Sequence, residues 1–507
     1  MASILLQFPP PPRRSFMTVF EQEGQLKDVP ESYPISCLPD YPDVTIQSER
    51  SCRMNVHYES AQNAFLAHEQ TSWKRSLHAW YNGGFVNMLE ELTNASDEVP
   101  VWLSAPCSKL LSFVQRLKSL TVSLFPQKSM SYEELLSKYS HVSNWHKSPV
   151  QALAWHPHVT KLAVALKDDS VVVYSSGSTL CPILKHKLQK QVADLAWQPL
   201  SSSVLAVGCQ TCILIWHVEP MSLAIRPSSS TVQILHSNSH SPITSLAWSP
   251  DSDLLLSASP KHSSIMVWDV PKEVGVALRR DRGGGVSLLS YSPDGSKLFT
   301  STLSSLFRVW ETKNWHSEIW SNLTGQCVAA CWSPDGTVLI FAMEGDSSLY
   351  GVRFRHGDNG SLSALSTSIM IADVSQVSVS TELIEQVRVG GQVKSIVWDT
   401  TGERIAVLFE PNELGNNSLV AVFKVTIHPI LELLPGGFVK GRSGESAHHI
   451  AFQPSFQKGA LLSVVWSSGR VGYVPMYFVP AQEIQQQRRL QLGPWSTSST
   501  MTPKDRF

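Results

Sequence analysis

The sequence lacks an excess of charge of either sign. Lysine and arginine total 41 and aspartate and glutamate total 42 in 507 residues, which gives a formal net charge of −1. Proteins that bind nucleic acid or an anionic membrane through bulk electrostatics carry a strongly basic patch or domain. The balanced composition offers no such attraction, and we therefore predict no direct contact with nucleic acid.

Long apolar runs are missing as well. No stretch approaches the ~20 apolar residues of a membrane-spanning helix. We therefore predict no direct membrane insertion, and contact with a membrane only through a partner. Cysteine is sparse: the eight cysteines are scattered, and a secretory signal segment is absent. A reducing cytosolic or nuclear environment is expected rather than secretion.

Catalytic and metal-binding motifs are absent too. The chain has no P-loop, no dinucleotide-binding glycine fingerprint, no nucleophile elbow and no H-E-x-x-H. Cys209 and Cys212 form a C-x-x-C pair and Cys327 and Cys331 a looser one, but the two pairs fall in different repeats, whereas a structural zinc ion needs four converging ligands. We predict no metal, no cofactor and no enzymatic activity.

The sequence does contain a recurring three-strand unit, seen most clearly at Ile243 to Trp268. Three short runs of apolar, branched or aromatic residues are separated by turns, and Ser249-Pro250-Asp251 suits the first turn because proline fixes φ and the polar side chains bond their own backbone. A meander of this size cannot bury its faces alone. The unit recurs six more times, beginning near Val150, Val192, Val286, Val328, Val393 and His449.

An aromatic residue ends the first strand of each copy and marks the repeat. Most intervals between these aromatics are about 41 to 54 residues, close to the spacing of WD40-type propeller blades. The sequence therefore predicts a mainly β fold, a seven-bladed WD40-type β-propeller whose structural blade aromatics are Trp155, Trp197, Trp248, Tyr291, Trp332, Trp398 and Phe452. At the end of the third strand of a copy, the WD dipeptide occurs only at Trp268-Asp269, so the Asp-His-Ser-Trp network of WD blades is not expected in most copies.

The segment before the repeats divides into an arm and an insert. Residues 1–60 are predicted to be an N-terminal arm in which a strand at about 16–21 joins the last blade as its outermost strand and closes the ring, followed by an irregular linker. Pro9 to Pro12 forms a short polyproline stretch, which is either a spacer or a docking peptide.

Residues 61–145 change to helical spacing and predict an α-helical insert, with a capping box formed by Ser131 and Glu134. Its apolar stripes pack on the propeller or form a groove for another protein, and in the second case Trp73, Leu77 and Trp80 are the partner-facing candidates. The propeller is predicted at residues 146–480, and a disordered polar tail at 481–507.

Longer strings are more specific than the WD pattern: SWKRSLHAW at Ser72–Trp80, AWHPHVTKLAVALKDDSVVVY from Ala154 and FQPSFQKGALLSVVWSSGR from Phe452. Through them the chain resembles the aladin family, the WD-repeat nucleoporins of the nuclear pore complex, over about residues 1–482. The resemblance implies a non-enzymatic scaffold on the cytoplasmic side of the nuclear envelope. It also implies other nucleoporins as partners, especially a polytopic pore-membrane nucleoporin that anchors it, and roles in nuclear protein import and at mitotic spindle poles. No Phe-Gly dipeptide occurs, so the chain cannot form the permeability mesh of the pore.

Two other classes of function stay open at this point. One is a WD-repeat adaptor in a soluble complex, such as a ubiquitin-ligase substrate receptor or a trafficking coat. The other is an enzyme with its active site in the propeller channel, for which convergent carboxylates or histidines lining the channel would be the structural sign.

Overall fold

The structure is a computed structural model. It describes residues 3–32, 38 and 41–46, isolated helical positions between 88 and 112, and residues 130–478, except 179, 219–224, 238–239, 281–282, 322, 355–367, 381–385, 412–418 and 428–429. The chain divides into two compact units, one formed by Met1–Ser48 and Leu136–Phe507 and the other by Glu49–Leu135.

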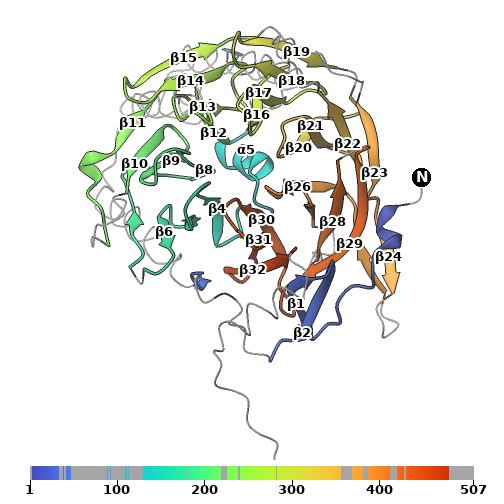
Figure 1. Ribbon diagram of the computed structural model, residues 1–507. Helices are drawn as coiled ribbons and strands as arrows, with labels where there is room; N and C mark the ends of the chain where they lie inside the picture. Colours follow the sequence, from blue (N-terminus) through green and yellow to red (C-terminus); the bar gives the residue numbers. More distant parts are fainter. Residues whose placement is uncertain are drawn as a thin grey trace, which may run out of the picture. The chain divides into compact units, whose positions relative to one another are not determined.

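The first unit is a ring of seven antiparallel blades (Figure 1). Blade 1 contains β4 (Val150–Trp155), β5 (Lys161–Leu166), β6 (Val171–Ser175) and β7 (Ile183–Leu184), and blade 2 contains β8 (Asp194–Trp197), β9 (Val204–Gly208), β10 (Ile213–His217) and β11 (Gln233–Leu235). Blade 3 contains β12 (Ser245–Trp248), β13 (Leu255–Ala258), β14 (Ile265–Asp269) and β15 (Val274–Leu278), and blade 4 contains β16 (Val286–Tyr291), β17 (Lys297–Thr302), β18 (Phe307–Glu311) and β19 (His316–Trp320). Blades 5 and 6 are β20 (Cys327–Trp332), β21 (Val338–Met343), β22 (Ser348–Arg353) and β23 (Ile369–Asp373), then β26 (Val393–Trp398), β27 (Arg404–Phe409), β28 (Leu419–Thr426) and β29 (Glu432–Lys440).

Blade 7 combines the two ends of the described chain. It contains β30 (Ala447–Gln453), β31 (Gly459–Trp466), β32 (Arg470–Tyr477) and the N-terminal β1 (Phe16–Gln22). The predicted fold, a mainly β seven-bladed propeller, is confirmed.

The hydrophobic core lies between the blades, because a single sheet cannot bury both of its faces. Each large cluster combines residues of two consecutive blades. One cluster joins Ala163 of blade 1 to Leu214 of blade 2, and another joins Val465 of blade 7 to Leu162 of blade 1. Every blade therefore depends on both neighbours, and an open ring would leave two apolar sheet faces in water.

The closing strand lies where the sequence predicts a strand, but it is not the outermost one. Glu21 and Gln22 of β1 pair in parallel with Met476 and Tyr477 of β32. On its other side β1 pairs with β2 (Gln25–Pro30), so β2 forms the outer edge. A two-residue turn with positive φ at Glu23 and Gly24 connects them. The mostly exposed β2 lacks the alternating apolar pattern that would have revealed it.

The stretch predicted as an irregular linker also contains a strand. Residues Val44 and Thr45 form β3, which pairs with Arg470 and Val471 of β32. This two-residue strand is too short to show a period in the sequence. It adds a second N-terminal tie to blade 7.

The first residues pack along blades 5 and 6. The 3-10 helix η1 (Ile4–Gln7) places Leu5 in the cluster shared by these blades, and the Phe8 ring lies 5.0 Å from that of Phe423 and 4.8 Å from that of Phe438, measured between centroids. Next to it lies an additional hairpin, β24 (Val377–Ser380) and β25 (Gln386–Val389). The segment just before the prolines therefore packs on its own propeller through Leu5 and Phe8.

The helical insert is described only in part. Helix α5 (Tyr132–Tyr139) begins with the predicted capping box, in which Glu134 N–H donates to Ser131 Oγ at 3.2 Å and Ser131 N–H donates to Glu134 Oε2 at 2.8 Å. Trp73, Leu77 and Trp80, most of the insert and the tail at 481–507 lie outside the described residues. Within the part of the chain that the structure describes, no helix has the length and apolar character needed to cross a membrane.

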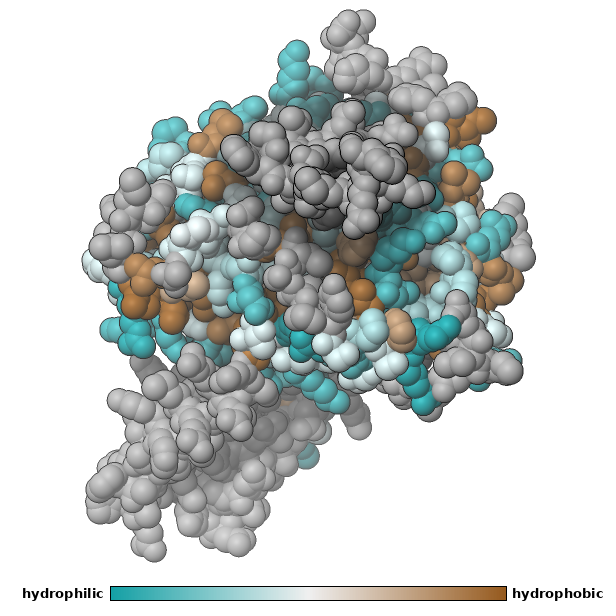
Figure 2. All heavy atoms as spheres, turned by 60° about the horizontal axis from the view of Figure 1, so that its bottom comes forward, coloured by the Kyte–Doolittle hydropathy of each residue, from teal (hydrophilic) through white to brown (hydrophobic). Residues whose placement is uncertain are grey.

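The surface is mixed in character. On the face drawn in Figure 2, hydrophobic residues lie in small groups between hydrophilic ones. Exposed apolar side chains occur on outer strands, including Val274 and Val276 of β15, Ile319 of β19 and Ile369 of β23. Scattered residues of this kind are normal for a protein surface.

Candidate binding pocket in the channel

The seven aromatics that mark the repeats lie at or next to the end of the innermost strand of each blade. Five are buried, and Tyr291 and Trp398 are partly buried. Three indoles donate to the preceding blade at equivalent positions: Trp197 to Ala154 O at 3.2 Å, Trp248 to Ala196 O at 3.1 Å, and Trp332 to Ser290 O at 3.1 Å.

Trp155 makes a different contact across the ring closure, since its Nε1 donates to the side-chain Oγ of Ser463 in β31 of blade 7 at 2.9 Å. Trp398 differs, because its indole donates to Gly402 O within its own blade at 3.2 Å. Tyr291 and Phe452 have no indole N–H to give. Four of the seven aromatic marks therefore connect neighbouring blades.

The WD hydrogen-bond network is incomplete, as the sequence predicts. In blade 3, Trp268 Nε1 donates to Ser257 Oγ at 2.9 Å, and that hydroxyl contacts His240 Nε2 at 2.9 Å. Nδ1 of His240 meets no partner among the described residues, where an aspartate would complete the network. In blade 2 the acceptor for Trp216 is Gln189 Oε1, at 3.1 Å.

The end of α5 and the residues after it lie at the centre of the ring (Figure 1). Leu136 packs with Val142, Trp145 and Ala193 of blade 2. Ser143 N–H also donates to His448 O of β30 in blade 7 at 2.8 Å. This segment, residues 136–145, therefore lies in the channel and contacts blades 2 and 7.

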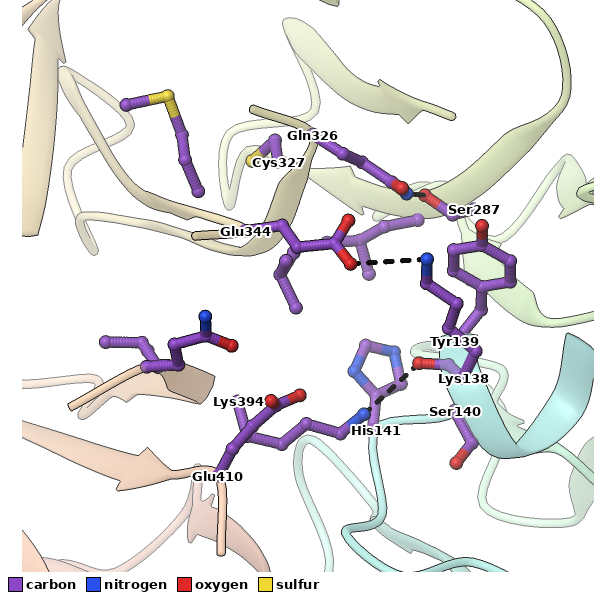
Figure 3. Close-up of a pocket in the computed structure, with 15 residues that line it drawn as sticks. Lys138, Tyr139, Ser140, His141, Ser287, Gln326, Cys327, Glu344, Lys394 and Glu410 are labelled. Carbon is purple, nitrogen blue, oxygen red and sulfur yellow. Dashed lines mark hydrogen bonds and ion pairs between the residues drawn. The ribbon is translucent and has the colours of Figure 1, made fainter. Parts of the chain in front are cut away.

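Beside this segment lies a pocket of about 630 Å³, part of it open to solvent (Figure 3). Blades 4, 5 and 6 form its walls, and the polar residues that line it are Lys138, Tyr139, Ser140, His141, Ser287, Gln326, Glu344, Gln392, Lys394 and Glu410. Leu288, Val328, Met343 and Val393 supply apolar surface.

Four charged side chains dominate the pocket. Lys138 Nζ lies 3.2 Å from Glu344 Oε1, and both side chains are nearly half exposed. Lys394 is buried and donates to Lys138 O near the C-terminal end of α5 at 3.3 Å, a favourable position for a cation. Burial lowers the pKa of Lys394, while Glu410 and Glu344 act in the opposite direction.

His141 lies between these groups in Figure 3. Burial, together with His449 and Lys394, lowers its pKa to about 4. Its imidazole is therefore uncharged at neutral pH and is a poor base. Glu344 is paired with Lys138 and His141 is weakly basic, so neither side chain is well suited to act as a general base.

The predicted cysteine pairs stay apart and carry free thiols. Cys209 and Cys212 lie at the β9–β10 turn, and Cys327 and Cys331 lie on β20. Among the described residues, no three His, Cys, Asp or Glu side chains converge to hold a metal ion.

Sequence patterns did not predict this pocket. Its residues come from α5, three inner strands and the ends of their neighbours, and only the placement of α5 in the channel brings them together. The available signal was a single lysine, Lys394, at a position of the inner strand where the other copies carry small or neutral residues.

Together, the seven blades, the closing strand and the filled channel define a WD-type propeller. A family model described as the Aladin seven-bladed propeller matches residues 131–477, and the chain belongs to this family. The family resemblance recognised in the sequence is therefore confirmed.

Individual proteins show the same similarity. Aladin of Arabidopsis thaliana is 28% identical over 353 residues, which cover 65% of this chain and 76% of that protein. Protein FIZZY-RELATED 2 of the same plant is 27% identical over 212 residues, or 39% of this chain and 42% of that protein. A chain in the crystal structure of the mitotic checkpoint complex is similar with a TM-score of 0.48 at 17% identity, covering 65% of this chain and 90% of that one.

Proposed function

We propose that the chain is a non-enzymatic scaffold of the nuclear pore complex, on the cytoplasmic side of the nuclear envelope. Membership of the aladin family across the whole propeller is the observation that supports this function. A closed ring with cores between all its blades is a stable platform for holding other proteins.

The anchor in this proposal is a polytopic nucleoporin of the pore membrane, and other nucleoporins are further partners. Through this attachment the chain supports the import of proteins into the nucleus, and in mitosis it acts at spindle poles. The propeller faces and the helical insert, including Trp73, Leu77 and Trp80, are the surfaces proposed for these contacts.

Depletion of the anchor tests the proposal. A fluorescently tagged full chain should be seen at the nuclear rim, and depleting the pore-membrane nucleoporin should release it while other pore components stay in place. Retention at the rim after complete depletion would contradict the anchoring, and absence from the rim in untreated cells would contradict the pore assignment itself.

A second candidate is an adaptor in a soluble complex. It is motivated by the matches to FIZZY-RELATED 2 and to the APC/C activator protein CDH1 of Saccharomyces cerevisiae, the latter 26% identical over 171 residues, which are 33% of this chain and 28% of that protein. Affinity purification separates the two candidates: nucleoporins in the eluate support the scaffold, whereas ubiquitin-ligase or coat subunits without nucleoporins support the adaptor.

A further inference from the structure

We propose that the channel pocket binds a carboxylate side chain, a glutamate or aspartate presented by an extended segment of a partner protein, and that Lys394 receives it. The inference rests on the proposed scaffold function and names the chemistry by which one partner is held.

Lys394 is buried but makes few hydrogen bonds. Its side chain is only 8% exposed, yet its ammonium group makes a single hydrogen bond, the 3.3 Å contact with Lys138 O. An ammonium group has three N–H donors. Among the described residues no carboxylate forms an ion pair with Lys394, since Glu410 and Glu344 act on it only at longer range. Two N–H groups of the buried Lys394 ammonium therefore have no acceptor among the described residues, and they lie beside the pocket.

Burial makes this arrangement less favourable than a direct ion pair. A buried ammonium group with one hydrogen bond to the protein keeps only part of its hydration, whereas an ion pair with further hydrogen bonds offsets most of that cost. A carboxylate has two oxygens and can accept both remaining N–H groups. The pocket therefore gains more from a carboxylate than from a neutral side chain.

The rest of the lining favours a ligand that carries a single negative charge. Glu344 and Glu410 face the same space as Lys394 (Figure 3), so a doubly charged phosphate would meet repulsion that a single carboxylate meets less. Gln392 and Tyr139 offer groups for a peptide backbone. Val393 and Leu288 offer apolar surface for the methylene groups of a glutamate.

The pH dependence of binding follows from the same geometry. The groups that face Lys394 are Glu344, Glu410, Lys138 and His141. A bound carboxylate stabilises the charged ammonium and so raises the pKa of Lys394, which burial lowers in the free protein. Affinity should be constant while Lys394 is protonated and should fall as the pH rises through its pKa.

The experiment uses the full chain and two fluorescent peptides that differ at one position. Both are acetylated and amidated seven-residue Gly-Ser peptides, one with glutamate and one with glutamine at the centre, and binding is followed by fluorescence anisotropy. We expect the glutamate peptide to bind at least fivefold more tightly. Lys394→Met should abolish the preference, and Lys394→Arg should retain it and remove the fall at high pH, because arginine stays protonated.

Controls separate this role from a purely structural one. Lys185→Met removes an exposed lysine that pairs with Asp168 elsewhere on the ring, and it should leave the preference unchanged. If Lys394→Met lowers the melting temperature, Lys394→Arg still decides the question through its pH profile. Equal binding of the two peptides, no binding of either at millimolar concentration, or equal competition by inorganic phosphate and acetate would each overturn the proposal.

The same variants distinguish failure of the pocket from failure of the proposed function. If the wild-type chain is at the nuclear rim but the peptides are not discriminated, the pocket proposal fails and the scaffold stands. If the peptides are discriminated but the chain purifies without nucleoporins, the pocket stands and the nuclear pore assignment fails.

Discussion

At the scale of single residues, a buried ion pair fastens the closing strand. Arg404 of blade 6 binds Glu21 of β1, with Nη2 2.7 Å from Oε1 and Nε 3.1 Å from the same oxygen, and the two side chains are 9% and 4% exposed. Removing Glu21 leaves the buried Arg404 with only the longer 3.7 Å ion pair with the exposed Glu403, so Glu21→Ala should lower the free energy of unfolding by about 3–5 kcal/mol, as measured by denaturant titration.

Two matched variants check this ion pair. Replacing both partners, as Glu21→Leu with Arg404→Met, should restore most of the lost stability, because an apolar pair needs no compensation. Asp269→Ala, which breaks the exposed pair with Lys272, should have little effect. If Glu21→Ala were as mild as Asp269→Ala, the pair would not hold the strand.

A second residue-scale prediction concerns Asp194, at the start of β8. Its carboxylate accepts the N–H groups of Leu246 and Leu195, but burial outweighs these bonds and raises its pKa to about 7. The folded protein therefore favours the protonated acid. The resulting stability is fully present below the ordinary pKa near 3.8 and is lost as the pH rises through about 7.

Replacing this acid tests the assignment. In a series of urea titrations between pH 4 and 8, the free energy of unfolding of the wild type should fall relative to that of Asp194→Asn as the pH rises, because only the wild type has to ionise this buried acid. Identical slopes for the two proteins would show that Asp194 does not titrate in this range.

At the scale of elements, η1 is the piece of structure whose contribution can be isolated most cleanly. Leu5 is fully buried in the cluster of blades 5 and 6, whereas its neighbour Leu6 is 57% exposed. Leu5→Ala should therefore cost about 2–5 kcal/mol of stability by leaving a cavity. Leu6→Ala in the same helix should cost much less, and equal losses in thermal melts would contradict the docking.

Deleting residues 1–25 is the larger version of this experiment. It removes η1, β1 and Glu21 together, so blade 7 loses its fourth strand and blades 5 and 6 lose Leu5 and Phe8. The melting temperature should fall by more than in either single variant. An unchanged melting temperature would refute the role of the N-terminal segment in closure.

The same elements show what sequence patterns can and cannot reveal. The inner strands were predictable because each ends near an aromatic residue. The exposed β2 and the two-residue β3 left no periodic signal, since their residues are fixed by pairing with β1 and β32 rather than by burial. The channel pocket was unpredictable for a related reason: its residues meet only because the segment after α5 enters the ring.

At the scale of the whole molecule, stability depends on the circle being complete. Every core cluster between blades needs both of its walls, and the contact between blades 7 and 1 joins strands from opposite ends of the repeat region. A substitution that weakens the contact between blades 7 and 1 should therefore destabilise both blades, whereas a substitution that weakens a contact within one blade should destabilise that blade only.

Trp155 and Trp398 allow this difference to be measured. The indole of Trp155 reaches Ser463 across the closure, and the indole of Trp398 bonds only within its own blade. Trp155→Phe should cost about 1–2 kcal/mol through the lost hydrogen bond alone and should speed amide hydrogen exchange in blades 1 and 7 together. Trp398→Phe should speed exchange in blade 6 only. Faster exchange confined to blade 1 in Trp155→Phe would mean that the closure does not couple the two ends of the ring.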